Sequence, residues 1–270
     1  MKQEFEPVVC DAIVLAAGEG QRLQQGRPKA LVELGGRPLF LWCLETMRAE
    51  PRVERIILVA PPQADAREAI ARALADMDRD RVRPLVDLTI EGGVRRQDSV
   101  MEGLRTLARL GAEEERIVLV HDAARPFVSS ALVRRCLGAM SASDEGDLER
   151  QERLPGLAHA VWGVGPAGAV PGLPVRETLK LVRDDRIVWT QPREHLYAVQ
   201  TPQAFRLGVL EMAHRRALEV GYHATDDAGL LEWQGVPVRL VAGDELNLKV
   251  TYPADLRLAE QLAPLHESAS

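Results

Sequence analysis

Long apolar runs, clustered cysteines and an excess of basic charge are all missing from this sequence. No stretch approaches the roughly 20 apolar residues that a membrane-spanning helix needs, and the acidic start is unlike a secretory signal, so we expect a cytoplasmic protein and no membrane partner. Cys10, Cys43 and Cys136 lie far apart, which argues against a disulfide framework or a cysteine metal site. A net charge of −6 argues against a nucleic-acid partner.

Lysine and asparagine are also scarce. Of the 34 basic residues only four are lysines (Lys2, Lys29, Lys180 and Lys249), and Asn247 is the single asparagine. Lysine offers a compact point charge on a flexible stem, whereas arginine offers a planar fork, so the two are not interchangeable. The few lysines and the single asparagine are therefore candidate functional residues, unless their scarcity is due to chance.

The apolar residues, 46% of the chain, suffice for a packed core and are arranged in alternating strand and helix patterns. We expect strands at 10–15, 55–60, 83–87, 117–121, 158–164 and 238–241, and helices at 39–49, 64–76, 98–110, 130–140, 207–219, 226–234 and from 253. This alternation predicts an α/β fold, a Rossmann-like doubly wound and mostly parallel sheet with right-handed crossovers and helices on both faces.

Two segments interrupt the alternation. The polar residues 141–153 predict an exposed loop, and the Pro- and Gly-rich residues 166–174 are expected to break any regular element. Two β-like stretches, 178–182 and 186–190, flank a turn and predict a projecting hairpin. We therefore expect a single domain, 1–270, with a β-arm subdomain at about 174–200 that forms a homodimer contact, since soluble proteins rarely leave such an edge unpaired.

A glycine-rich turn, AAGEGQRL (16–23), follows the first predicted strand, and RPKAL (27–31) comes directly after it. Such a turn presents backbone N–H groups where doubly wound folds bind ligands, and these groups are suited to binding phosphate. Leu23 replaces the third glycine of a dinucleotide fingerprint, and the GKS or GKT of a Walker A loop is absent. The turn therefore predicts a phosphate site with Arg22 and Lys29 beside it, or alternatively a tight turn with exposed charges.

The same turn, followed by PK, resembles the signature loop of the nucleotidyltransferases. Four further blocks narrow the resemblance: GGVRRQDSV (92–100), VHDAARPFV (120–128), QTPQAF (200–205), and ATDDAGLLE through NLKVTYPADL (224–256). Together they are similar to the family of 2-C-methyl-D-erythritol 4-phosphate cytidylyltransferases, over nearly the whole chain. The resemblance implies transfer of CMP from CTP to a small phosphorylated polyol in the non-mevalonate isoprenoid pathway.

For the nucleotide, the resemblance implies a site made from the glycine-rich turn and the second block. Arg22 and Lys29 would stabilise charge on the CTP phosphates, and the backbone of Ala16, Ala17 and Gly18 would meet the nucleotide, with Gly93 and Ser99 around base and ribose. Ser99 and Gly93 could instead serve as an N-cap or turn residue. Asp122, at the end of a predicted strand, is the candidate ligand for Mg²⁺, or alternatively a cap for the next segment.

For the acceptor, the resemblance implies contacts from Arg125, Arg193, Thr201, Thr225 and Lys249. Arg193 and Lys249 are also implied in catalysis, and Arg193, on the arm, would act in the partner's site of a homodimer. Asn247 is expected to fix the loop that carries Lys249 by side-chain hydrogen bonds. His121 is not needed as a base, because the acceptor phosphate is already anionic.

Three positions depart from the family pattern: Ala30, Val94 and Leu246 stand where polar or acidic residues are usual. At these positions the resemblance therefore implies neither nucleotide selectivity nor a second acidic metal ligand. A ribitol 5-phosphate cytidylyltransferase for wall-polymer synthesis is an alternative, because its nucleotide half would look the same. A nucleotide-sensing protein without turnover is disfavoured, because a binding module needs no transition-state clamp.

Overall fold

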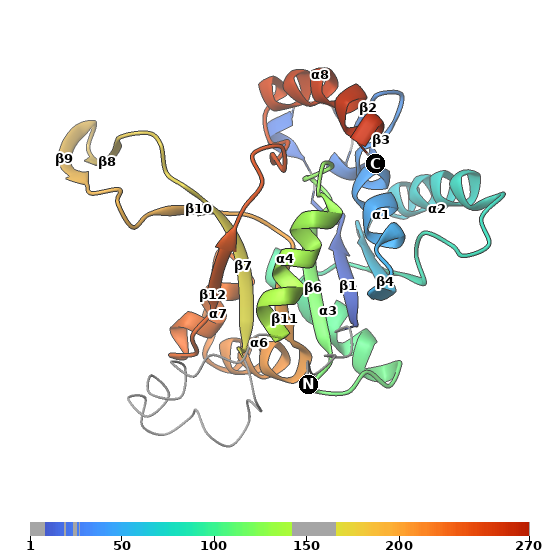
Figure 1. Cartoon of the computed structure of the whole chain (residues 1–270), viewed down its shortest axis with the longest axis horizontal. Coiled ribbons are helices and arrows are strands. Elements are labelled where there is room, and N and C mark those ends of the chain that lie inside the picture. The colour runs from blue at the N-terminus through green and yellow to red at the C-terminus, as the bar shows by residue number, and fades with distance from the viewer. Residues whose placement is uncertain (1–8, 19, 24–25, 27, 142–165, 270) are drawn as a thin grey trace, which may run out of the picture.

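A mixed eight-stranded sheet forms the centre of the part of the chain that the computed structural model describes, residues 9–18, 20–23, 26, 28–141 and 166–269 (Figure 1). Its parallel half consists of β1 (Cys10–Leu15), β4 (Val53–Ala60), β5 (Leu88–Glu91) and β6 (Ile117–Asp122). Its other half consists of β7 (Gly168–Pro174), β10 (Tyr197–Val199), β11 (Gln203–Arg206) and β12 (Arg239–Ala242). The order is β10-β7-β11-β6-β1-β4-β5, with β12 beside β7.

Helices cover both faces of this sheet, as the doubly wound prediction requires. One face packs against α1 (Leu39–Ala49), α2 (Ala64–Asp78) and α4 (Ser130–Ser141), and the other against α3 (Arg96–Arg109), α6 (Leu207–Val220) and α7 (Asp227–Trp233). Alternate residues of a strand point to opposite faces, so Val14 joins the first core and Ile13 the second. The predicted α/β fold class is confirmed.

A third apolar cluster lies at the edge of the sheet and anchors the glycine-rich turn. It joins η1 (Gln21–Leu23), at the end of this turn, to β2 (Glu33–Leu34) and α8 (Pro253–Ala269). The short elements η2 (Lys29–Leu31) and β3 (Arg37–Pro38) precede and follow β2 along the chain. Leu23 is buried in this cluster beside Trp42 and Phe127. The position where a dinucleotide site has glycine is therefore a leucine in this chain, and its buried side chain anchors the loop in the third apolar cluster.

The prediction that 166–174 would break regular structure is wrong, because β7 runs through it. A Cβ on Gly168 would lie 2.5 Å from the ring of Phe205, and one on Gly172 would lie 2.8 Å from Leu240. The two glycines therefore leave room for the neighbouring side chains to pack against the strand. Pro171, which has no N–H, falls between the β11 pairing at 168–169 and the β10 pairing at 172–174.

Two other predicted strands are shifted in the structure or lie outside its described residues. The strand expected at 83–87 lies instead at Leu88–Glu91, where pairing with β4 begins at Ile57, and the buried Leu85 belongs to the preceding loop. The strand expected at 158–164, and nearly all of the loop expected at 141–153, lie outside the described residues. Within the described part of the chain, no helix has the length and apolarity to cross a bilayer.

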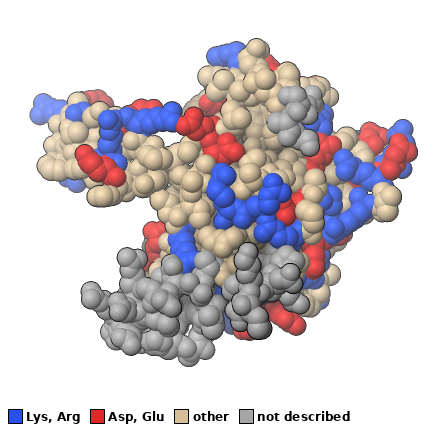
Figure 2. Space-filling view, in the orientation of Figure 1, with Lys and Arg blue, Asp and Glu red and all other residues tan. Residues whose placement is uncertain are grey.

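The predicted hairpin is confirmed. β8 (Leu179–Arg183) and β9 (Arg186–Gln191) pair antiparallel through a two-residue turn, Asp184–Asp185, in which both residues have positive φ. Figure 1 shows this hairpin reaching away from the sheet, and it shares no strand pairing with it in the described residues. All residues of both strands are exposed, and Figure 2 shows basic and acidic side chains on the surface of this arm.

Candidate nucleotide site

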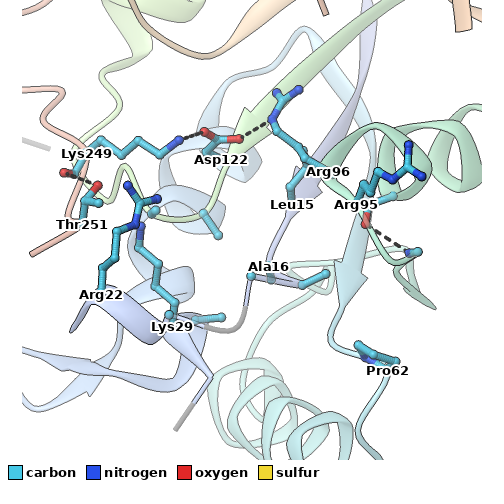
Figure 3. Close-up of a pocket in the computed structure, with 18 of the residues that line it drawn as sticks. Leu15, Ala16, Arg22, Lys29, Pro62, Arg95, Arg96, Asp122, Lys249 and Thr251 are labelled. Atoms are coloured by element: carbon cyan, nitrogen blue, oxygen red, sulfur yellow. Dashed lines mark hydrogen bonds and ion pairs between the residues drawn. The ribbon is translucent and has the colours of Figure 1, made fainter. Parts of the chain in front are cut away.

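A cleft of about 770 Å³ opens at the carboxyl ends of β1 and β6. Nine of the predicted site residues line it: Ala16, Ala17, Gly18, Arg22, Lys29, Gly93, Ser99, Asp122 and Lys249. They come from four separate segments, which the parallel strands bring to one edge of the sheet (Figure 3). This is the edge at which open α/β sheets bind ligands.

Backbone contacts hold the glycine-rich turn against the start of η2. The amide of Lys29 donates to the carbonyl of Gly18 at 3.2 Å, and Gly20 has φ +72°. A Cβ on Gly20 would lie 2.9 Å from the Cβ of Lys29 and 3.0 Å from its backbone nitrogen. Only glycine permits this close approach, which places the Lys29 side chain in the cleft.

Three cations, Arg22, Lys29 and Lys249, lie on one side of the cleft (Figure 3). Burial, helped by the nearby positive charge of Lys249, lowers the pKa of Lys29 to about 8. A lysine whose pKa is lowered by burial and by neighbouring positive charge is suited to binding an anion, which would relieve the repulsion. The Arg22 guanidinium lies 5.7 Å from the ring centroid of Tyr252.

Asp122 ends β6 and faces these cations. Its Oδ2 accepts from Nζ of Lys249 at 2.7 Å and its Oδ1 accepts from Nε of Arg96 at 3.1 Å. Burial favours the neutral acid, but the charges and hydrogen bonds of Arg96 and Lys249 outweigh it and hold the pKa of Asp122 well below its usual range. Asp122 is therefore an ionised carboxylate in the cleft, and its side chain does not cap the next segment.

The glycines of the second block pack closely against the rest of the site. A Cβ on Gly92 would lie 2.6 Å from Ala17, and the amide of Gly93 donates to Oγ of Ser99 at 3.1 Å. Ser99 lies inside α3, which begins at Arg96, so the alternative of an N-cap is wrong. Val94, one of the departures from the family pattern, lines the cleft and is fully open to solvent.

Two predicted acceptor residues support the site from outside its lining. Arg125 donates to the carbonyls of Asn247 at 2.7 Å and Val199 at 3.3 Å. The hydroxyl of Thr201 accepts from the amide of Asp122 at 3.1 Å. Asn247 donates to the carbonyl of Thr201 at 2.8 Å, which confirms that it fixes the Lys249 loop.

His121 links these supports. Its Nδ1 lies 3.0 Å from Oγ1 of Thr201 and its Nε2 lies 3.1 Å from the carbonyl of Arg125. Because a carbonyl only accepts, Nε2 carries the proton, and Nδ1 accepts from the Thr201 hydroxyl. Burial lowers the pKa of His121 to about 4, so the ring is neutral and structural, as its sequence context indicates.

The other two predicted acceptor residues are not brought to this cleft. Thr225 is exposed in the segment before α7, and Arg193 follows β9 on the arm, where it donates to the carbonyl of Arg176. Neither lines the cavity. Their roles stay predictions.

Sequence reasoning missed Arg96. It lines the cleft, and it bridges Asp122 to Asp227, whose Oδ2 accepts from NH1 of Arg96 at 2.7 Å. Burial disfavours the guanidinium charge, but these two carboxylates outweigh it and raise the pKa of Arg96. The doubled arginine in GGVRRQDSV was the available signal, but nothing in the sequence distinguished Arg96 from Arg95.

A doubly wound sheet with a glycine-rich turn and a cationic cleft at its carboxyl edge defines a nucleotide-phosphate-binding protein of the nucleotidyltransferase class. The family model described as "IspD: 2-C-methyl-D-erythritol 4-phosphate cytidylyltransferase" matches residues 10–149 and 158–263. The chain belongs to this family.

Individual relatives agree. A 2-C-methyl-D-erythritol 4-phosphate cytidylyltransferase of Geobacillus kaustophilus is 39% identical, over 93% of this chain and 96% of its own length. A bifunctional IspD/IspF enzyme of Solidesulfovibrio magneticus is 40% identical, but the chain spans only 57% of that longer protein. The crystal structure of the Thermus thermophilus cytidylyltransferase matches with a TM-score of 0.65 at 33% identity, covering 93% of this chain and 98% of that one. None of these relatives favours the ribitol alternative.

Proposed function

We propose that this chain transfers CMP from CTP to 2-C-methyl-D-erythritol 4-phosphate. The products are 4-diphosphocytidyl-2-C-methyl-D-erythritol and pyrophosphate. The observation that carries the proposal is the cluster of Arg22, Lys29 and Lys249 around the glycine-rich turn of a chain in this family. We take residues 1–270 as one domain, and we place the reaction in the cytoplasm, where CTP is available.

In this reaction an oxygen of the acceptor phosphate attacks the α-phosphorus of CTP. The bond from that phosphorus to the oxygen bridging to the β-phosphorus breaks, and pyrophosphate leaves with the electron pair. The acceptor phosphate is an anion, so no residue has to remove a proton, and catalysis consists of positioning and charge stabilisation. Lys29 and Arg22 would meet the phosphates of CTP, while the backbone of Ala16, Ala17 and Gly18 approaches the nucleotide.

Asp122 fits the role of a Mg²⁺ ligand. It is ionised and lies in the cleft, and Mg²⁺ in nucleotide sites is usually held by one or two carboxylates together with substrate phosphates. Among the described residues no cluster of three acidic, histidine or cysteine side chains could hold a metal alone, so the triphosphate would supply the other ligands. Bound there, Mg²⁺ would neutralise charge that develops on the phosphates.

On the acceptor side, Lys249 would bind the acceptor phosphate, with Arg125, Thr201 and Thr225 as further positioning groups. Arg193 would reach the site of a second subunit. The arm supports this assignment, because Ile187 is 65% exposed and Trp189 57% exposed on it. Apolar side chains on an exposed hairpin are suited to a subunit contact in a homodimer.

The test is pyrophosphate release from CTP and Mg²⁺ with each of two acceptors, 2-C-methyl-D-erythritol 4-phosphate and ribitol 5-phosphate, and with ATP, GTP and UTP as nucleotide controls. We expect release with CTP and the first acceptor. Release only with ribitol 5-phosphate would keep the chemistry and change the acceptor. Silence with both acceptors, from folded protein that binds CTP, would contradict the proposal.

A further inference from the structure

Asp227 is a buried carboxylate outside the lining of the cleft, yet it is joined to the site. It is the first residue of α7 and is 1% exposed. Its Oδ2 accepts from NH1 of Arg96 at 2.7 Å, and its Oδ1 accepts from Nε2 of His214 at 3.0 Å. A buried carboxylate is costly unless it is paired and hydrogen-bonded, so this arrangement is held firmly on both oxygens.

Arg96 connects this carboxylate to the site. It is the first residue of α3, and its planar guanidinium uses NH1 for Asp227 and Nε for Asp122. A planar fork held at one edge by a buried carboxylate has little freedom to leave a second carboxylate at its other edge. The orientation of Arg96 toward Asp122 is therefore set by α7. All residues of α7 are described in the structure, and none of them lines the cleft.

The two partners of Asp122 are therefore unequal. Arg96, on Oδ1, is tied to a second carboxylate, whereas Lys249, on Oδ2, makes one ion pair within the described part of the chain, through a flexible side chain that is 42% exposed. Figure 3 shows the two cations approaching the carboxylate from opposite sides. A lysine with one partner can exchange it more readily than an arginine held between two.

We propose that Asp227 is a positioning residue of the nucleotidyltransferase site: through Arg96 it fixes Oδ1 of Asp122, so that Oδ2 is the oxygen that exchanges Lys249 for the metal–nucleotide complex. This inference rests on the proposed function. Release from Oδ2 frees Lys249 for the acceptor phosphate, so occupation of the nucleotide site prepares the acceptor site.

The first test is Asp227→Asn, which keeps the shape of the side chain and removes its charge. Loss of an outer hydrogen-bond partner of a metal site typically costs about 10- to 100-fold in metal affinity or activity. We expect a loss of that size in Mn²⁺ affinity in the presence of CTP. Electron paramagnetic resonance, which detects free Mn²⁺, measures this affinity. We expect a similar fall in kcat, a smaller change in KM for the acceptor, and partial rescue by Asp227→Glu.

Asp11→Asn is the matched control. Asp11 is also fully buried and paired with two arginines, Arg55 and Arg116, but it lies at the start of β1, whereas the cleft is at the strand's other end. Both variants remove a buried charge partner and both should lower the melting temperature. Only Asp227→Asn should weaken Mn²⁺ binding.

Equal Mn²⁺ affinity and equal kcat in wild type and folded Asp227→Asn would overturn the inference and leave Asp227 a structural residue. If Asp227→Asn does not fold, Arg96→Lys replaces it, because a lysine keeps the charge and cannot bridge both carboxylates; unchanged Mn²⁺ affinity there would overturn the inference equally. Failure of the proposed function is distinguished by the wild-type enzyme, which would release no pyrophosphate while the Mn²⁺ comparison still reads out the role of Asp227.

Discussion

Lys29 is the residue on which the proposed chemistry depends most directly. Replacing it with alanine removes a preorganised charge from the phosphates of CTP, and loss of one such donor typically costs about 100- to 1,000-fold in kcat. We expect a fall of that size for Lys29→Ala in steady-state pyrophosphate release, with little change in the acceptor KM. Arg105→Ala, which removes an exposed cation paired with Glu102, is the control and should leave the rate unchanged. A near-wild-type rate for Lys29→Ala would remove it from the mechanism.

The depressed pKa of Lys29 predicts a particular pH dependence. Its pKa of about 8 means that the free enzyme loses this positive charge as the pH rises through 8, far below the usual range for lysine. Because kcat/KM reports the free enzyme, kcat/KM for CTP should fall on the alkaline side of that pH, and the corresponding limb in kcat should lie higher because bound triphosphate favours the charged form.

Lys29→Arg tests that assignment. An arginine stays charged throughout this pH range, so its kcat/KM, although lower, should show no fall near pH 8. An alkaline limb at the same pH in wild type and Lys29→Arg would mean that another group is responsible.

At the scale of the element, the glycine-rich turn depends on Gly20. A non-glycine residue in this left-handed region costs roughly 1–2 kcal/mol, and at Gly20 a Cβ would also press on Lys29. Displacing a catalytic group by about 1 Å can cost roughly 100-fold, so we expect Gly20→Ala to lower kcat/KM for CTP by about that factor.

Gly26→Ala is the matched control. Gly26 has a similar φ of +65°, but a Cβ there would meet nothing within 4 Å among the described residues. Both variants should lose the stability that the left-handed backbone costs in urea unfolding, Gly20→Ala more because of its contact with Lys29, while only Gly20→Ala should lose the larger part of its activity. Equal activities in the two would show that strain, and not contact with Lys29, governs the turn.

At the scale of the whole molecule, the arm predicts shared active sites. In a heterodimer of one Arg193→Ala chain and one Lys29→Ala chain, one of the two sites would combine Lys29 of the first chain with Arg193 of the second. Co-expressed chains with two different tags, purified through both, should therefore regain activity that neither variant has alone. Purified heterodimers without activity would place Arg193 in its own subunit's site or outside any site.

Much of the architecture followed from local pattern. Hydrophobic runs and helical periodicity predicted β1, β4 and β6 and the helices around them, because burial on both faces leaves a plain apolar signal. The mostly exposed β5 lacks this signal and was predicted too early along the chain. β7 was missed because glycine and proline usually break strands, and only its neighbours Phe205 and Leu240 explain why they are accommodated.

The sequence by itself determined the fold class, the position of the glycine-rich turn and most of the cations beside it, because these depend on residues close together along the chain. The tertiary structure alone decided which charges meet. Arg96 and Asp227 are 131 residues apart, and Asp122 and Lys249 are 127 apart. No periodicity reports such pairs, because they form only where the ends of separate strands and helices converge at one edge of the sheet.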